Sequence, residues 1–458
     1  MMNSIIILSH ERQSRLKEER VFFLNLIYNG CDKMKKITSL LISALFLGLI
    51  FTGCGKKSEA KGPVTVEIWH TYNGSQAACL EDIATRFNES QDKYIVQVLA
   101  QDYTGFADSV YNAVANKIGP SIIFNYGTTA VDYANEGLAI DITKYIKEDK
   151  KNGDTFMQNI IDSLPLAMRT DVLGFADGGI YYVPGCTTGP VFFYNKTIYD
   201  ELGLKAPTDW NELAENSRIV FEKKGIPGFH SDGLVDNIQA MIMQNDLGYI
   251  DVKNKKVTFA GSKLEEIYQW YADCCKKGWF EFNTVGRYAS EDLATGAIAA
   301  FSGSCVNDQY IQMLDGELGM APWIATSNGI SFYTAWNRGP IFLSRDENVD
   351  RVAYEFVKFF LAPANNAKWA VANSALSPYA TTEATEEYKN YINNLPATSA
   401  LPCVQANMSA SGSFPNVTGS AAIRNILVEY LNNVVDGRIS AKDAVAAIEK
   451  ECNEALNQ

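Results

Sequence analysis

The fold is decided by the stretch from Val64 to Ala100, which reads VTVEIWHTYNGSQAACLEDIATRFNESQDKYIVQVLA. Residues 64–69 alternate apolar and polar side chains and include β-branched residues, a pattern typical of a half-buried strand. Residues 77–90 instead repeat apolar side chains at the spacing of a helix. These side chains are Leu80, Ile83, Ala84 and Phe87. Because residues 94–100 alternate again, the stretch predicts one βαβ unit.

The same pattern continues, with a helix predicted over 106–117 and a strand over 121–126. Repeated βαβ units form a parallel sheet, and such sheets bind ligands in the crevice beyond the carboxyl ends of their strands. Aromatic or polar side chains follow each of the three predicted strands. We therefore expect His70, Tyr103 and Tyr126 to lie on one rim of the sheet as candidate ligand contacts. His70 and Tyr126 would fit equally well as structural residues.

The second half of the chain alternates strands and helices in the same style. Strands are predicted over 190–194 and 297–301, and an amphipathic helix over 264–277. Asp209 is the expected N-cap of a further helix. The chain is therefore predicted to be an α/β protein, and no periodic internal repeat is visible in it.

Residues 34–53 resemble a bacterial export signal. Lys35 and Lys36 form a short positive region, and the apolar stretch over 37–51 is too short to span a bilayer comfortably. The sequence FTGC that ends at Cys54 resembles a lipobox, in which the cysteine is lipidated and becomes the new N-terminus. The alternatives are an ordinary signal peptide and a buried apolar helix. We expect an extracytoplasmic protein that is lipid-anchored to the cell membrane through Cys54.

The residues on either side of this signal have their own interpretation. Met34 is a better start than Met1, because the positive region of a signal begins close to the N-terminus. Residues 1–33 are therefore interpreted as an upstream segment from a misread start. Residues 54–63 are polar and lack apolar periodicity, which is typical of a tether.

Composition and charge exclude some functions. The chain has 458 residues and a net charge of −13. Residues 1–53 carry seven Lys/Arg and four Asp/Glu, so the remainder carries −16. Such a balance disfavours nucleic acid as a partner, because nucleic-acid binding depends on cationic side chains.

Nine cysteines are present, but Cys31 and Cys54 fall outside the predicted folded body. The remaining seven show no spacing typical of a zinc site. They fit buried small apolar residues better than a disulfide framework, and we expect no metal and no cofactor.

Five short motifs occur in order between Val64 and the C-terminus. They are Trp69-His70, Arg86-Phe87-Asn88, Tyr194-Asn195-Lys196 followed by Trp210, Val285-Gly286-Arg287, and Asp436-Gly437-Arg438. In this order the chain resembles the extracellular solute-binding proteins of carbohydrate-type ABC importers, the group that includes maltose-binding and glycerol-3-phosphate-binding proteins.

This resemblance implies a periplasmic-binding-protein-like fold of class II, with two α/β lobes that close on ligand in the cleft between them. The N-terminal lobe would comprise residues 64–186 and 332–385. The C-terminal lobe would comprise residues 187–331 and 386–458. The chain would then cross between the lobes three times.

The resemblance also implies ligand contacts. Tyr103 matches a ligand tyrosine of the glycerol-phosphate branch, Thr187 and Thr188 lie where that branch has paired serines, and Ser304 lies in its small-residue turn. The branch's phosphate-binding arginine has no evident counterpart around residues 413–416. A glycerophosphate ligand is therefore less favoured than a sugar.

The chain departs from the glycerol-phosphate branch at two further positions. Gly127 falls near a position where the glycerol-phosphate branch has a glutamate, and Leu234 falls where it commonly has tryptophans.

Sugar recognition needs aromatic faces and a few placed polar groups. Trp336 and Arg338 lie at a predicted lobe crossing and supply a ring and a guanidinium, although Trp336 would also fit the core and Arg338 an ion pair. Asp232 and Asp236 are expected to be solvated surface carboxylates. Four tryptophans are expected in the cores: Trp210, Trp270, Trp279 and Trp369.

These observations favour a monomeric substrate-binding lipoprotein of an ABC importer. It would capture a sugar, polyol or glycerophosphate by lobe closure and deliver it to the permease subunits. The alternative is a surface lipoprotein enzyme acting on glycans, but the chain has no GxSxG, HExxH, P-loop or GxGxxG motif. A protein-binding adhesin would be expected to show repeats, and none is visible.

Overall fold

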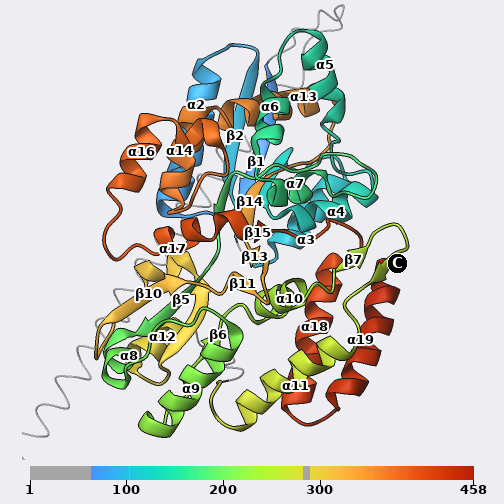
Figure 1. Ribbon diagram of the computed structural model, residues 1–458. Helices are drawn as coiled ribbons and strands as arrows, with labels where there is room; N and C mark the ends of the chain where they lie inside the picture. Colours follow the sequence, from blue (N-terminus) through green and yellow to red (C-terminus); the bar gives the residue numbers. More distant parts are fainter. Residues whose placement is uncertain (1–62, 103, 282–288) are drawn as a thin grey trace, which may run out of the picture. The chain divides into compact units, whose positions relative to one another are not determined.

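The computed structural model describes residues 63–102, 104–281 and 289–458. The predicted upstream segment, export signal and lipidated Cys54 therefore lie outside the described residues, as does Tyr103. Within these ranges, no helix combines the length and the apolar character needed to cross a bilayer. The described elements gather around two sheets, which we call the sheets of the first and second lobes (Figure 1).

The first-lobe sheet has the strand order β2-β1-β3-β14-β4. Its first three strands are parallel and its last two are antiparallel to their neighbours. The strands are β1 (Val64–His70), β2 (Tyr94–Ala100), β3 (Ile122–Asn125), β4 (Cys186–Thr188) and β14 (Trp336–Phe342). The strands and helices predicted between residues 64 and 126 are confirmed, because each observed end lies within three residues of the prediction.

Helices cover both faces of this sheet, because successive side chains of a strand point to opposite faces. Ile122 and Phe124 join the core beneath α2 and α13, whereas Ile123 joins the core beneath α3 and α4. The helices of this lobe are α2 (Gly74–Glu89), α3 (Phe106–Ala115), α4 (Gly127–Asn135), α5 (Thr143–Lys151), α6 (Phe156–Ser163), α7 (Leu166–Leu173), α13 (Glu347–Phe360), α14 (Pro363–Ala372) and α15 (Ala380–Glu383). The next helix, α16 (Glu386–Asn393), packs against α14.

The second-lobe sheet has the strand order β10-β5-β9-β6. Its strands are β5 (Pro190–Asn195), β6 (His230–Ser231), β9 (Ala300–Ser304) and β10 (Leu318–Pro322). The strand expected over 297–301 is thus displaced by three residues. Its helices are α8 (Lys196–Leu202), α9 (Trp210–Lys224), α10 (Leu234–Gln244), α11 (Ser262–Lys276), α12 (Ala289–Thr295), α17 (Leu401–Ala406), α18 (Ser420–Val435) and α19 (Ala441–Leu456).

Local sequence explains where several of these elements begin. The Asp209 carboxylate accepts hydrogen bonds from the backbone N–H groups of Asn211 and Glu212, which confirms it as the N-cap of α9. Trp210 and Trp369 are buried in the cores as predicted, and Trp270 and Trp279 are partly buried against the second-lobe core. The seven cysteines among the described residues are free thiols, as expected.

The chain passes from the first sheet to the second through Gly189, the single residue between β4 and β5. A Cβ atom at this position would lie 2.1 Å from the hydroxyl oxygen of Tyr333. That hydroxyl donates a 2.8 Å hydrogen bond to the carbonyl of Pro190. Tyr333 belongs to β13 (Tyr333–Thr334), which pairs in parallel with β15 (Ser411–Gly412) just before β14 begins. The two crossings therefore pack directly on each other.

Candidate binding pocket

A cavity of about 440 Å³ lies where these crossing segments meet α4, α7, α10 and α18. Its volume is within the range typical of small-molecule sites. The lining combines carboxylates, amides, hydroxyls, aromatic rings and one guanidinium. The lining residues are Tyr126, Gly127, Thr128, Asp171, Thr188, Asp236, Gln239, Tyr249, Ser304, Thr334, Ala335, Trp336, Asn337, Ser413, Phe414, Ser420 and Arg424.

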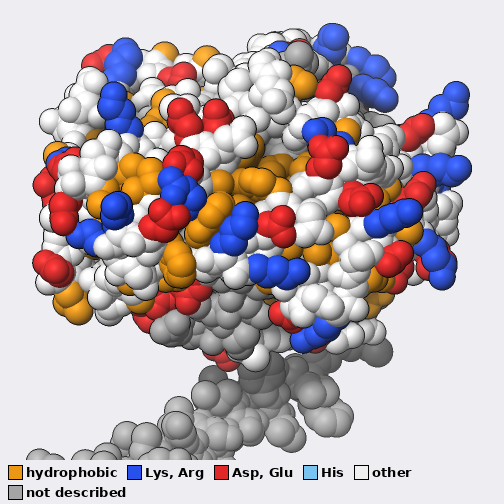
Figure 2. All heavy atoms as spheres, turned by 60° about the horizontal axis from the view of Figure 1, so that its bottom comes forward, with side chains coloured by type: hydrophobic (Ala, Val, Ile, Leu, Met, Phe, Trp, Pro, Cys, Tyr) orange, Lys and Arg blue, Asp and Glu red, His pale blue; other side chains and the backbone are white. Residues whose placement is uncertain are grey.

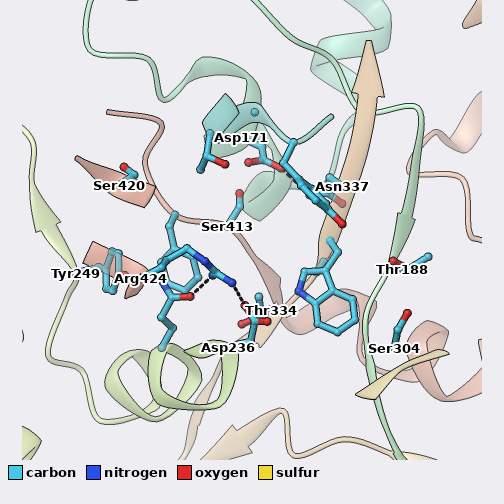
Figure 3. A pocket seen from close by; sticks show the side chains of 17 residues that line it. Asp171, Thr188, Asp236, Tyr249, Ser304, Thr334, Asn337, Ser413, Ser420 and Arg424 are labelled. Atoms are coloured by element: carbon cyan, nitrogen blue, oxygen red, sulfur yellow. Dashed lines mark hydrogen bonds and ion pairs between the residues drawn. The ribbon is translucent and has the colours of Figure 1, made fainter. Parts of the chain in front are cut away.

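One side of the pocket is formed by Asp171 of α7 and Asn337 of β14 (Figure 3). The Asn337 amide nitrogen donates a 2.8 Å hydrogen bond to the Asp171 carboxylate. Burial raises the pKa of Asp171 to about 6, because the charged form loses water, and hydrogen bonds from Asn337 and Asn416 only partly oppose this. Asp171 therefore presents a buried acceptor to the pocket.

Asp236 of α10 and Arg424 of α18 lie together on another side (Figure 3). The Arg424 Nη2 atom is 2.9 Å from Asp236 Oδ1, and Arg424 Nη1 donates to the side-chain oxygen of Gln239. Gln239 in turn donates to the hydroxyl of Tyr249. Burial raises the pKa of Asp236, while Arg424 and a hydrogen bond from Trp336 oppose the increase. The result is a fixed ion pair facing the cavity.

Aromatic side chains supply the apolar part of the lining. Trp336, the first residue of β14, is half-buried. The rings of Tyr249 and Phe414 pack with centroids 4.5 Å apart, and Phe414 also contacts Phe332 at 5.3 Å. Tyr126 ends the rim after β3 and is 41% exposed. Such a mixture of flat apolar faces and fixed polar groups suits a polar ligand with C–H surfaces.

Four of the residues predicted from sequence line this cavity: Tyr126, Thr188, Ser304 and Trp336. Tyr126 directly follows β3, and the other three residues belong to β4, β9 and β14. The carboxyl end of β3, the crossing strands and the second-lobe sheet therefore meet at one place. Tyr103 cannot be compared, since it lies outside the described residues.

Three other predicted residues are placed behind the pocket wall. Thr187 is fully buried and donates a 2.7 Å hydrogen bond to the Asn337 amide oxygen. His70 is 2% exposed, and its Nδ1 atom accepts a hydrogen bond from the backbone N–H of Tyr72. Burial lowers the pKa of His70, so its imidazole is held neutral. None of these contacts reaches the cavity.

Arg338 also lies behind the lining. Its guanidinium carbon is 5.1 Å from the Tyr72 ring centroid and 5.8 Å from that of Tyr126. Trp336 and Arg338 are two residues apart on β14, so their side chains point to the same side of the strand. Arg338 packs against the Tyr126 ring but does not itself line the cavity.

The expectation that Asp236 is a solvated surface carboxylate is wrong. Asp236 is 7% exposed, because the first turn of α10 faces the pocket and Arg424. Asp232 is exposed as expected. The missed signal is the series of polar residues Asp236, Asn237 and Gln239 within an otherwise apolar helix, all of which are buried.

The arginine that lines the pocket, Arg424, lies in the first turns of α18. The segment before it is tied to the first lobe. Asn416 donates a 2.6 Å hydrogen bond to the backbone oxygen of Asp171, and Asn135 of α4 donates a 2.8 Å bond to Thr418. These contacts fix the start of α18, and so Arg424, against the first lobe.

Two α/β lobes joined by crossing strands, with a polar pocket between their elements, define the class of two-lobed solute-binding proteins. Residues 82–397 match the family of bacterial extracellular solute-binding proteins, and the chain belongs to this family. It is therefore an extracytoplasmic protein, as predicted.

Curated relatives include the sn-glycerol-3-phosphate-binding periplasmic proteins of Rhizobium meliloti and Brucella abortus. The chain is 25% identical to the first over 263 residues, which are 54% of this chain and 59% of that protein. It is 25% identical to the second over 264 residues, 54% of this chain and 58% of that protein. The matched part therefore spans less than two thirds of these relatives.

Solved structures of similar fold include the cyclic α-maltosyl-1,6-maltose binding protein of Arthrobacter globiformis. It matches with a TM-score of 0.72 and 20% identity, over 86% of this chain and 99% of that chain. UgpB from Mycobacterium tuberculosis, in complex with glycerophosphocholine, matches with a TM-score of 0.68 and 17% identity, over 87% and 99%. These likenesses confirm the prediction of a two-lobed periplasmic-binding-protein-like α/β fold.

Proposed function

We propose that this protein captures a sugar or a related polyol outside the cytoplasm and delivers it to the permease subunits of an ABC importer. The observation that carries the proposal is the 440 Å³ cavity, whose lining sets carboxylates, amides and a guanidinium beside an indole ring. Family membership and the sugar or glycerophosphate ligands named for its relatives support it.

The polar chemistry of the lining suits hydroxyl groups, because a hydroxyl both donates and accepts hydrogen bonds. Asp171 and Asp236 are acceptors, whereas Arg424 and Asn337 are donors. Thr334 Oγ1 is buried and has no hydrogen-bond partner among the described residues. A buried polar atom without a partner is costly, so a ligand hydroxyl or a water at this point would be stabilising.

The mechanism we propose is ligand-driven lobe closure. We assign residues 64–186 and 332–385 to the N-terminal lobe and residues 187–331 and 386–458 to the C-terminal lobe. Asp171 then lies in one lobe and the Asp236–Arg424 pair in the other, so a ligand that contacts both favours the closed form. The ligand can shift the equilibrium between the open and closed forms only by as much as its affinities for the two forms differ.

The proposed ligand contacts are the residues that line the pocket, together with Tyr103. Thr187, His70 and Arg338, which were also predicted from the sequence, lie behind this lining. Lipidation of Cys54 would hold the monomer close to a permease in the same membrane. Nucleic acid is not a proposed partner. On the face drawn in Figure 2, Lys and Arg side chains are interspersed with Asp and Glu, and no continuous basic area is seen there.

A thermal-shift screen of the purified protein against sugars, polyols and glycerophosphates tests this function. A ligand that binds only the folded state stabilises it, by about 2.7 kcal/mol at a concentration of roughly 100 times Kd. We expect an increase in Tm with at least one sugar or polyol.

The alternative function is that of an enzyme acting on glycans, since two carboxylates line one pocket. The Asp236 carboxylate is engaged by Arg424, which argues against its use as a nucleophile or a base. Turnover of a glycan by the purified protein, together with no increase in Tm for any compound, would overturn the transport proposal.

A further inference from the structure

We propose that Asp236 sets the charge class of the ligand: by pairing with Arg424, it makes the pocket accept uncharged polyhydroxylated ligands and reject phosphate. This inference rests on the proposed binding function and goes beyond it, because it assigns specificity to one residue. It also predicts that this chain differs from the curated relatives that bind sn-glycerol 3-phosphate.

The donors of Arg424 are already engaged within the chain. Arg424 is the sole Lys or Arg side chain among the described residues that line the cavity. Its Nη2 atom lies 2.9 Å from Asp236 and its Nη1 atom donates to Gln239. An anion bound bidentately through the two terminal nitrogens would compete with both of these partners. The charge of the guanidinium is already balanced by a carboxylate of this chain.

The charges of the lining also disfavour a phosphate. The described lining contains two carboxylates, Asp171 and Asp236, against this one guanidinium. A phosphate group would bring further negative charge next to both carboxylates, and like charges at short range repel each other. A hydroxyl brings none, and it can donate to either carboxylate while it accepts from Arg424 or Asn337.

A mobile carboxylate would move aside for a phosphate, so the position of Asp236 must be fixed. Asp236 is 7% exposed and lies in the first turn of α10. Its carboxylate lies 2.9 Å from the Arg424 guanidinium. Gln239, one helical turn later, holds Arg424 from the same helix. Asp236 and Gln239, both on α10, therefore hold the Arg424 guanidinium together.

The test is isothermal titration calorimetry on the purified wild type and the Asp236→Asn variant, with sn-glycerol 3-phosphate and glycerol as probes. Asparagine keeps the shape and removes the charge, which leaves Arg424 free for an anion. We expect the variant to bind sn-glycerol 3-phosphate at least about tenfold more tightly than the wild type does, with no gain for glycerol. Equal affinity of the two proteins for sn-glycerol 3-phosphate, or no binding by either, overturns the assignment.

The matched control is Asp82→Asn. Asp82 pairs with Arg86 at 2.9 Å on the surface of α2, so the variant frees an arginine outside the pocket. A gain in phosphate binding by this control equal to that of Asp236→Asn would show a nonspecific effect and overturn the assignment.

A second measurement needs no variant and so does not depend on folding of Asp236→Asn. The wild type is titrated with a sugar that raises its Tm and with the phosphate monoester of the same sugar. Weaker binding of the monoester by about tenfold or more supports the inference, and equal or tighter binding overturns it. If the wild type binds the monoester as tightly as the sugar, only this inference fails. If the wild type binds no sugar or polyol, the proposed function itself is contradicted.

Discussion

The hydroxyl of Thr187 donates a 2.7 Å hydrogen bond to the amide oxygen of Asn337, and both side chains are buried. Because its oxygen is held in this way, the Asn337 amide directs its nitrogen toward Asp171, 2.8 Å away. Thr187 therefore acts on the pocket through Asn337, as a positioning residue.

Thr187→Val is expected to weaken binding without removing any group that faces the cavity. Loss of the hydroxyl leaves a buried amide oxygen unpaired, which we expect to lower the free energy of unfolding by about 1–3 kcal/mol. Affinity for a sugar found in the screen should fall roughly threefold to tenfold, the effect of one lost hydrogen bond. Urea unfolding and calorimetry measure the two effects.

Thr65→Val is the control for this change, since it replaces the same side chain on β1, away from the lining. If Thr187→Val left both affinity and stability at the values of the Thr65→Val variant, the positioning role would be wrong.

The raised pKa of Asp171 should make the stability of the protein depend on pH. Burial raises its pKa in the folded state to about 6 from the ordinary 3.8. As the pH rises from 4, the unfolded chain loses this proton before the folded chain does, so the free energy of unfolding falls until the pH passes the folded pKa. The loss amounts to about 3 kcal/mol in total.

In the Asp171→Asn variant this contribution is absent. The difference in unfolding free energy between variant and wild type should therefore shift in favour of the variant by up to about 3 kcal/mol between pH 4 and 7. Urea unfolding across this range measures the difference. Parallel pH profiles of the two proteins would show that Asp171 titrates normally in the folded state.

Sequence patterns predict the fold well where the pattern is local. The alternation in residues 64–69 and the apolar face of residues 77–90 each depend on neighbouring residues, and both elements form as expected. The same holds for Asp209, whose capping bonds are made within its own helix.

The candidate site is less predictable, because its polar residues depend on partners far away in sequence. Asp236 becomes a buried carboxylate only through Arg424, which lies on another helix. Asp171 is held by Asn337, from a strand 166 residues later. A local pattern such as the polar residues within the apolar helix α10 can indicate burial, but it does not identify the distant partner that holds each carboxylate. Tyr126, Thr188 and Trp336, in contrast, lie at strand ends or crossings that a fold prediction already marks.

Gly189→Ala is expected to disturb the lobe crossing. The new Cβ would meet the Tyr333 hydroxyl at 2.1 Å and displace it from Pro190. Overpacking of this kind lowers the free energy of unfolding by about 1–3 kcal/mol. Gly261→Ala is the control, since its Cβ would meet nothing within 4 Å. Urea unfolding of both variants decides the matter, and equal stability would contradict the close packing of the crossings.

Trp336 offers the most direct optical test of the pocket. It lines the cavity and donates a hydrogen bond to Asp236, whereas Trp210, Trp323 and Trp369 are buried in the cores. Binding of a sugar should therefore change the tryptophan fluorescence mainly through Trp336, and Trp336→Phe should abolish most of that change.

The affinity of the same variants gives a second readout. Because phenylalanine keeps an aromatic face but loses the N–H, we expect the affinity of Trp336→Phe for the sugar to fall by only about tenfold or less. Trp336→Ala removes the face as well and should cost roughly tenfold to a hundredfold in affinity. Trp279→Phe, at a tryptophan that is partly buried against the second-lobe core and does not line the cavity, is the control that should keep both signal and affinity. A full fluorescence change in Trp336→Phe, or unchanged affinity in Trp336→Ala, would place the ligand away from β14 and contradict the pocket as the binding site.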